Sequence, residues 1–230
     1  MTGLLAVIVG QSLGLPLRDP EGFLGPAWIR LPLLVLGAYV FDELKSHEEN
    51  GEAPVRIEEA VVLEKVGEKA DGIEDGVRLG SALARGQNLA RTLGNLPGNV
   101  ATPEYLGREA ERIAAENGMK VTLLGPGEME AEGLNTLLAV SRGSEKEPRL
   151  IVLEHRKGAA DAKPLVLLGK GLTFDAGGIS IKPAAGMEEM KFDMCGGAAV
   201  LGAMQAIGEL DRPVNVVGVV PSSENLLSGA

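Results

Sequence analysis

One glycine-rich stretch of the chain, residues 169–199, holds the side chains most capable of chemistry: Lys170, Asp175, Lys182 and Asp193. The apolar run Leu165–Leu168 precedes them and is typical of a buried strand. Ligands of open α/β sheets bind just beyond the carboxyl ends of strands. The order of residues therefore predicts a ligand site that begins at Lys170.

Each of these residues also has a simpler interpretation. Lysine and aspartate after a strand are commonly surface groups or a local salt bridge, and Asp193 alone favours a helix N-cap. The run Gly169–Thr173 suggests a phosphate loop. However, no glycine lies five residues before Gly169, and neither serine nor threonine directly follows Lys170. No G-x-G-x-x-G motif opens a helix here either, so the spacing excludes both nucleotide-binding motifs.

The elements that must position these residues alternate along the chain. Short, nearly continuous apolar runs predict strands buried on both faces at 137–140, 150–154 and 165–168. A further buried strand is expected at 214–220 and a strand at 121–124. Helices are expected at 73–93, 103–117, 127–132 and 196–210. Thr102-Pro103 supplies a capping hydroxyl and a first-turn proline, and Gly118 a helix stop. The alternation predicts an α/β fold, a three-layer sandwich with a mostly parallel, mixed central sheet.

Composition and charge exclude several classes of protein. The 230 residues carry a formal net charge of −10, which repels nucleic acids and anionic membranes. Neither apolar run near the start, residues 4–9 or 31–40, reaches the roughly 20 residues that span a bilayer. The single Cys195 forms no intrachain disulfide. We therefore expect a soluble, cytoplasmic protein that binds neither nucleic acid nor membrane.

Taken together, the stretch resembles the first signature of the leucyl aminopeptidase family, the cytosolic di-metal aminopeptidases. Residues 169–183 carry the match, and it continues in register at Met187, Met190, Lys191, Asp193 and Met194. Weaker similarity extends it to Tyr39–Asp42, Asn95–Asn99 and Val214–Asn225. The resemblance therefore spans about residues 37–230.

The resemblance implies a role for each residue of the site. Lys170 and Asp175 would be metal ligands, with Asp175 shared between two divalent ions, manganese or zinc or else magnesium. Asp193 would bind the second metal beside the free amine of the substrate, and Met190 would contact the substrate. Two such ions activate a bridging water and polarise the scissile carbonyl. Lys182, kept protonated, would be catalytic and stabilise the oxyanion.

The same resemblance implies a zinc-exopeptidase-like fold and a function. The activity would be release of leucine-like N-terminal residues from peptides that have a free N-terminal amine. Members of the family assemble as hexamers, so a homo-oligomer is expected. A non-catalytic scaffold or oligomerisation module derived from such an enzyme is the alternative.

The sequence also departs from the family pattern. The second signature, Asn-Thr-Asp-Ala-Glu-Gly-Arg-Leu, is absent from the 230 residues. It supplies an aspartate, a glutamate and the arginine that holds a bicarbonate, so three of five metal-binding side chains are present. We expect an unclear N-terminal remnant over residues 1–40 and a catalytic domain over 41–230, incomplete at its C-terminus. Such a chain would bind metal weakly and have little or no peptidase activity.

Four further residues of interest have smaller expected roles. Ala176 replaces the serine usual after the metal-binding aspartate. Cys195 stands where glycine is typical, as a buried filler or as a thiol of lowered pKa near metal. His47 and His155 have no second histidine at ligand spacing, so solvated or structural roles are expected.

Overall fold

The computed structural model describes residues 35–45 and 73–229. The chain forms two compact units, residues 1–85 and 86–230. In the first unit, residues 35–37 are helical. The helix α3 (Ile73–Asn95) begins in the first unit and ends in the second. His47 and most of the expected N-terminal remnant lie outside the described residues. None of the helices in the described ranges combines the length and hydropathy that a membrane crossing requires.

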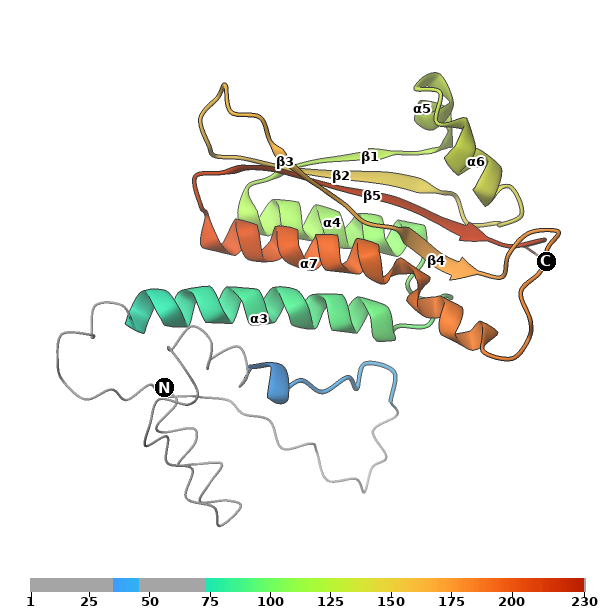
Figure 1. Ribbon diagram of the computed structural model, residues 1–230, viewed down its shortest axis with the longest axis horizontal. Helices are drawn as coiled ribbons and strands as arrows, with labels where there is room; N and C mark the ends of the chain where they lie inside the picture. Colours follow the sequence, from blue (N-terminus) through green and yellow to red (C-terminus); the bar gives the residue numbers. More distant parts are fainter. Residues whose placement is uncertain (1–34, 46–72, 230) are drawn as a thin grey trace, which may run out of the picture. The chain divides into compact units, whose positions relative to one another are not determined.

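The second unit is built on a mixed sheet centred on one long strand (Figure 1). The strands are β1 (Lys120–Leu124), β2 (Arg149–Arg156), β3 (Leu165–Leu168), β4 (Gly171–Asp175) and β5 (Asn215–Asn225). β1 pairs antiparallel with β2, and β2 antiparallel with β5. β3 pairs parallel with the first half of β5, and β4 parallel with its second half. The prediction of an α/β fold with a mixed sheet is confirmed, with two of these four pairings parallel.

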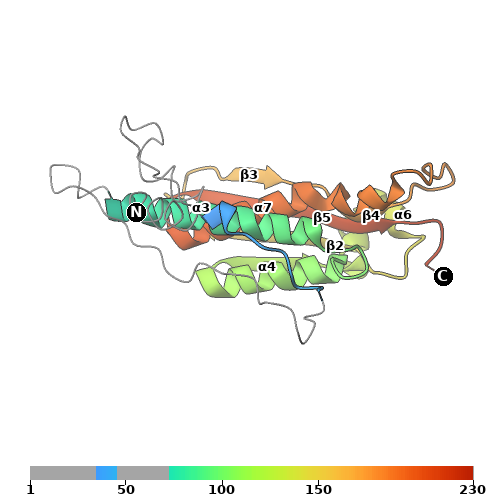
Figure 2. The ribbon, with the colours of Figure 1, turned by 90° about the horizontal axis from the view of Figure 1, so that it is seen from below.

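Two helices, α4 (Pro103–Asn117) and α7 (Cys195–Leu210), lie side by side on one face of this sheet (Figures 1 and 2). The bounds of α4 agree with the sequence prediction. Thr102 Oγ1 accepts a hydrogen bond from the Tyr105 amide at 3.3 Å, and Gly118 ends the helix with φ +62°. Proline in the first turn costs no hydrogen bond, and glycine adopts the left-handed conformation without strain.

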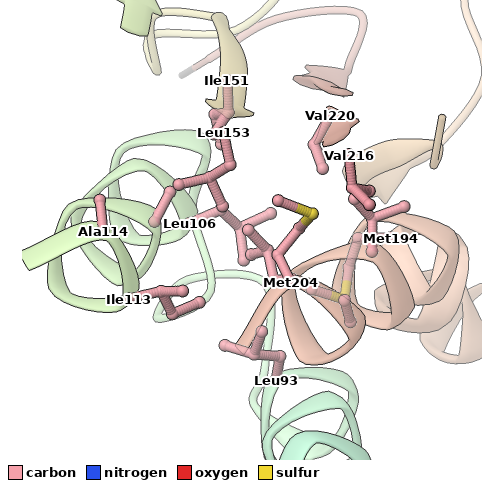
Figure 3. Packing of buried hydrophobic residues seen from close by; sticks show 14 residues of the cluster. Leu93, Leu106, Ile113, Ala114, Ile151, Leu153, Met194, Met204, Val216 and Val220 are labelled. Carbon is pink, nitrogen blue, oxygen red and sulfur yellow. The ribbon is translucent and has the colours of Figure 1, made fainter. Parts of the chain in front are cut away.

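The hydrophobic core lies between these helices and the sheet (Figure 3). Leu106 and Ile113 enter it from α4, and Ile151 and Leu153 from alternate positions of β2. Met204 of α7 lies near the centre of the cluster. The buried side chains alternate along β2 because only one face of the strand meets the helices.

Three sequence predictions about the strands are wrong. Residues 150–154, in β2, are not buried on both faces, because burial alternates along that strand. Residues 137–140 were expected to form a strand, but they lie in the helix α6 (Asn135–Ser141), which follows the short helix α5 (Pro126–Ala131). A short apolar run is too short for its periodicity to distinguish a strand from a helix. Leucine and alanine, which fill residues 137–139, have high helix propensity. β3 is not buried on both faces: Leu165, Val166 and Leu168 are exposed, Leu168 by 70%. Among the described strands β3 pairs only with β5 and so forms an edge.

Candidate functional site

Lys170 is held by a close contact between two backbone segments. The turn after β3 lies on the N-terminus of α7, where the Gly197 amide donates to the Lys170 carbonyl oxygen at 2.7 Å. A Cβ at Gly169 would lie 2.2 Å from the Gly196 carbonyl oxygen, and one at Gly196 3.0 Å from the Lys170 nitrogen. The absence of side chains at these glycines lets the turn meet the helix, so the backbone of Lys170 is fixed.

Gly169→Ala is expected to lower the free energy of unfolding by about 1–3 kcal/mol, the usual cost of overpacking. The added methyl group meets the backbone of Gly196 and Gly197, which moves only if α7 moves. Urea unfolding followed by circular dichroism measures the change. Gly178→Ala is the matched control, because a Cβ there meets nothing within 4 Å. Equal unfolding midpoints for the two variants would show that the turn does not pack as described.

Asp175 ends β4, next to the last residue of β5. Its side chain is largely buried, and Oδ1 accepts hydrogen bonds from the Gly177 amide at 2.9 Å and from Asn225 Nδ2 at 2.8 Å. Burial disfavours ionisation, but the hydrogen bonds from Gly177, Lys182 and Asn225 outweigh it. The pKa of the Asp175 carboxyl therefore lies below its usual value, and the group is a carboxylate at neutral pH.

Lys182 reaches Asp175 because the loop between them turns back tightly. The Lys182 amide donates to the Ala176 carbonyl oxygen at 3.0 Å. Gly177 has φ +80°, and a Cβ at this residue would lie 2.6 Å from the Ser180 carbonyl oxygen. The turn therefore requires glycine at position 177. It places Lys182 Nζ 3.1 Å from Asp175 Oδ2, as an ion pair.

Asp193 lies in the 3₁₀ helix η2 (Met187–Met194), which packs against β4. It does not cap α7: the N-cap residue is Met194, and no side chain caps that helix. Asp193 Oδ2 lies 2.8 Å from Lys170 Nζ. This oxygen is buried and, among the described residues, has no hydrogen-bond partner of good geometry beside the ion pair with Lys170.

The four predicted residues thus form two lysine–aspartate pairs, Lys170 with Asp193 and Lys182 with Asp175. Within the described residues, no three His, Cys, Asp or Glu side chains converge to hold an ion. The available donor set is instead two carboxylates and an amine. The buried carboxylate oxygen of Asp193, which accepts no hydrogen bond of good geometry, fits a divalent cation, since such ions prefer oxygen ligands.

The other sequence candidates have mixed outcomes. Met190 is half-buried in η2, and Met194 belongs to the hydrophobic core. Cys195 is exposed, so the buried-filler interpretation is wrong. Partial burial of the thiol and then the charge of Asp193 raise its pKa, so a lowered pKa is wrong as well. His155 is structural, as expected: it is buried in β2 and its Nε2 lies 2.9 Å from the Arg212 carbonyl oxygen.

Sequence reasoning missed the contact of Asn225 with Asp175. The two residues lie fifty positions apart, and they meet only because β4 and β5 pair in parallel. The predicted strand, residues 214–220, stops five residues short of Asn225, whereas β5 continues to that residue. The strand was therefore predicted too short for Asn225 to be placed beside the end of β4, where parallel strands bring their carboxyl ends to the same edge.

Comparison with known proteins identifies relatives of this chain. The sequence profile of the family described as "Cytosol aminopeptidase family, catalytic domain" matches residues 88–230. A probable cytosol aminopeptidase of Nitrosococcus oceani is 61% identical over 158 residues, 68% of this chain and 32% of that protein. One of Alkalilimnicola ehrlichii is 47% identical over 202 residues, 87% of this chain and 40% of that protein.

Two solved structures are similar as well. The bottromycin maturation enzyme BotP in complex with Mn has a TM-score of 0.77 and 32% sequence identity, over 94% of this chain and 44% of that one. The cytosol aminopeptidase of Coxiella burnetii has a TM-score of 0.72 and 27% identity, over 87% of this chain and 40% of that one. This chain spans 32–40% of the length of the curated relatives named above. Because the family profile matches well over half of the chain, and close relatives agree with it, the chain belongs to the cytosol aminopeptidase family.

Proposed function

We propose that this chain carries part of the active site of a metal-dependent aminopeptidase that releases leucine-like N-terminal residues from peptides. The observation that supports it most is the pairing of the four signature residues, Lys170 with Asp193 and Lys182 with Asp175, before and after β4. Family membership supports the peptidase activity, and the similar BotP structure is described as a complex with Mn. The curated relatives are named for the cytosol, in agreement with a cytoplasmic location.

Three side chains would hold two divalent ions: Lys170, Asp175 and Asp193. Such ions, when bound, supply an activated water and polarise the scissile carbonyl. Lys170 Nζ lies 2.8 Å from Asp193 Oδ2, and the close packing at Gly169 and Gly197 fixes the backbone that carries this side chain. It can serve as a ligand once its proton has left. Bicarbonate has no role that we assign to this chain, because its arginine belongs to a signature that the 230 residues lack.

Lys182 and Asp193 would divide the polar contacts with the substrate. Lys182 is a cation at the end of a tight turn, so it is pre-positioned to stabilise negative charge that develops on the carbonyl oxygen. Asp193 provides a carboxylate for the free α-amine of the peptide. An internal peptide bond offers no such amine, so this contact selects for the N-terminal residue. Met190, half-buried in the same 3₁₀ helix, would contact the apolar side chain of the substrate.

Titration of the chain with Mn²⁺ tests the metal site directly. We expect saturable binding, detected by the loss of the electron paramagnetic resonance signal of free Mn²⁺, and competition by Zn²⁺. Binding should be weak and hydrolysis of leucine p-nitroanilide slow or absent, because two of the five implied carboxylate and amine ligands are missing. The absence of saturable binding would overturn the proposal. Rapid Mn²⁺-dependent hydrolysis would contradict the expectation of weak activity.

A scaffold or oligomerisation module is the second candidate. The observation that favours it is the exposed apolar surface of β3, at Leu165, Val166 and Leu168. Exposed apolar side chains on an edge strand are typical of interaction surfaces. The Mn²⁺ titration separates the candidates, because a module of this kind has no need of a metal site.

A further inference from the structure

Asn225 is the last residue of β5, and its amide touches the carboxylate of Asp175. Asn225 Nδ2 donates to Asp175 Oδ1 at 2.8 Å. The backbones of the two strands meet at the same point, where the Ala176 amide donates to the Asn225 carbonyl oxygen at 2.9 Å. Asn225 is therefore fixed by its own backbone, and its side chain is a short, stiff link to Asp175.

The two oxygens of Asp175 have different surroundings. Oδ1 accepts two neutral hydrogen bonds, from Asn225 Nδ2 and from the Gly177 amide, which occupy its two lone-pair directions. Oδ2 faces Lys182 Nζ at 3.1 Å. With Oδ1 held by two hydrogen bonds, the carboxylate plane cannot rotate freely, and Oδ2 is the oxygen presented to Lys182.

A bulge in β4 makes this contact possible. The register runs from Leu172 opposite Ser223 to Phe174 opposite Glu224, so Thr173 is the extra residue. Without the bulge, Phe174 would lie opposite Asn225, and Asp175 would lie one position beyond the end of β5. Thr173 is fully buried, and its hydroxyl donates to the Ser223 carbonyl oxygen at 3.4 Å. Bulges of this kind re-aim a side chain next to active sites.

We infer that Asn225 is a positioning residue of the metal site. It acts through Asp175: it holds Oδ1 and so orients Oδ2 toward the place where the cation binds. The inference rests on the proposed function, since it concerns the same site. Partners that orient a metal-binding carboxylate typically contribute about 10–100-fold to metal affinity.

The test is the affinity for Mn²⁺ of Asn225→Ala and Asn225→Asp, measured in the full 230-residue chain by electron paramagnetic resonance. Asn225→Ala is expected to weaken binding by about 10–100-fold, because Asp175 loses one of two holding bonds. Asn225→Asp also removes the hydrogen bond to Oδ1, but it adds a negative charge that attracts a cation, so it should weaken binding less than Asn225→Ala does. The thermal unfolding midpoint is recorded for each variant.

Asn215→Ala is the matched control. Asn215 is the first residue of the same strand, and its side chain also forms hydrogen bonds to another segment of the chain, but at the end of the strand far from Asp175. Its Nδ2 donates to the Ala159 and Ala162 carbonyl oxygens, and its Oδ1 accepts from the Gly158 amide. It should lower the unfolding midpoint while leaving the affinity for Mn²⁺ unchanged. A role of Asn225 in stability alone would give the same pattern as Asn215.

The outcomes separate the inference from the proposed function. If the wild-type chain binds Mn²⁺ and Asn225→Ala binds it equally well, the inference is overturned and the metal site stands. If the wild-type chain binds no Mn²⁺, both are overturned. Weaker binding in Asn225→Ala and Asn225→Asp but not in Asn215→Ala supports the inference.

Discussion

Asp175→Asn is expected to weaken Mn²⁺ binding by more than about 100-fold, beyond the usual effect of an outer partner. Asp175 is the carboxylate that two ions would share, and asparagine lacks both the negative charge and one of the two oxygens. The substitution keeps the shape of the side chain. Its carbonyl oxygen still accepts from the Gly177 amide and Asn225, so the loop and the end of the sheet should stay folded. Titration with Mn²⁺ gives the affinity, and circular dichroism checks the fold.

Asp211→Asn provides the control for the change in charge. Asp211 is an exposed residue at the other end of α7 and forms an ion pair with Lys157. Its φ of +49° suits asparagine, which adopts the left-handed conformation more easily than most residues. This variant should bind Mn²⁺ as the wild type does. Equal affinities in Asp175→Asn and Asp211→Asn would place the ion elsewhere in the protein.

Local signals made α4 fully predictable from the sequence. Its start depends on Thr102 and Pro103 and its end on Gly118, and each acts through the backbone of its immediate neighbours. The bounds of β3, Leu165–Leu168, were also predicted correctly from the local sequence. Burial was not predictable in this way, because it depends on what lies beside the strand. Four apolar residues in a row indicated a strand covered on both faces, yet β3 is an edge in the described sheet.

The sequence identified the members of the candidate site but not how they pair. The family signature marked Lys170, Asp175, Lys182 and Asp193, and the structure pairs each lysine with one of the aspartates. Which lysine meets which aspartate depends on the turn at Gly177 and on the place of η2 beside β4. Those features are set by backbone packing over long separations, which residue spacing does not report.

The core and the site are connected through α7. Its N-terminus lies under the turn that carries Lys170, and its middle lies in the hydrophobic cluster. Gly218 of β5 leaves room for Met204: a Cβ on that glycine would lie 2.7 Å from Met204 Cγ and 3.2 Å from Sδ. The methionine therefore packs directly on the strand backbone and sets how closely α7 approaches the sheet.

Met204→Ala is expected to lower the free energy of unfolding by about 2–5 kcal/mol, as large-to-small substitutions in cores do. Met204 is fully buried at the centre of the cluster (Figure 3). Gly218, directly opposite, has no side chain that could fill the space, so a cavity remains after the substitution. Urea unfolding monitored by circular dichroism measures the loss. Met204→Leu conserves most of the volume and should cost less than about 1.5 kcal/mol.

The affinity for Mn²⁺ should be unchanged in Met204→Ala, measured at low temperature and without urea so that the variant stays folded. Met204 lies nine residues into α7, about 14 Å along the helix from its first residue. The backbone contacts that fix Lys170 are all at the first turn of the helix, and none involves Met204. If Met204→Ala is folded but binds Mn²⁺ more weakly, the distance between α7 and the sheet sets the position of Lys170, and the contacts of the first turn do not.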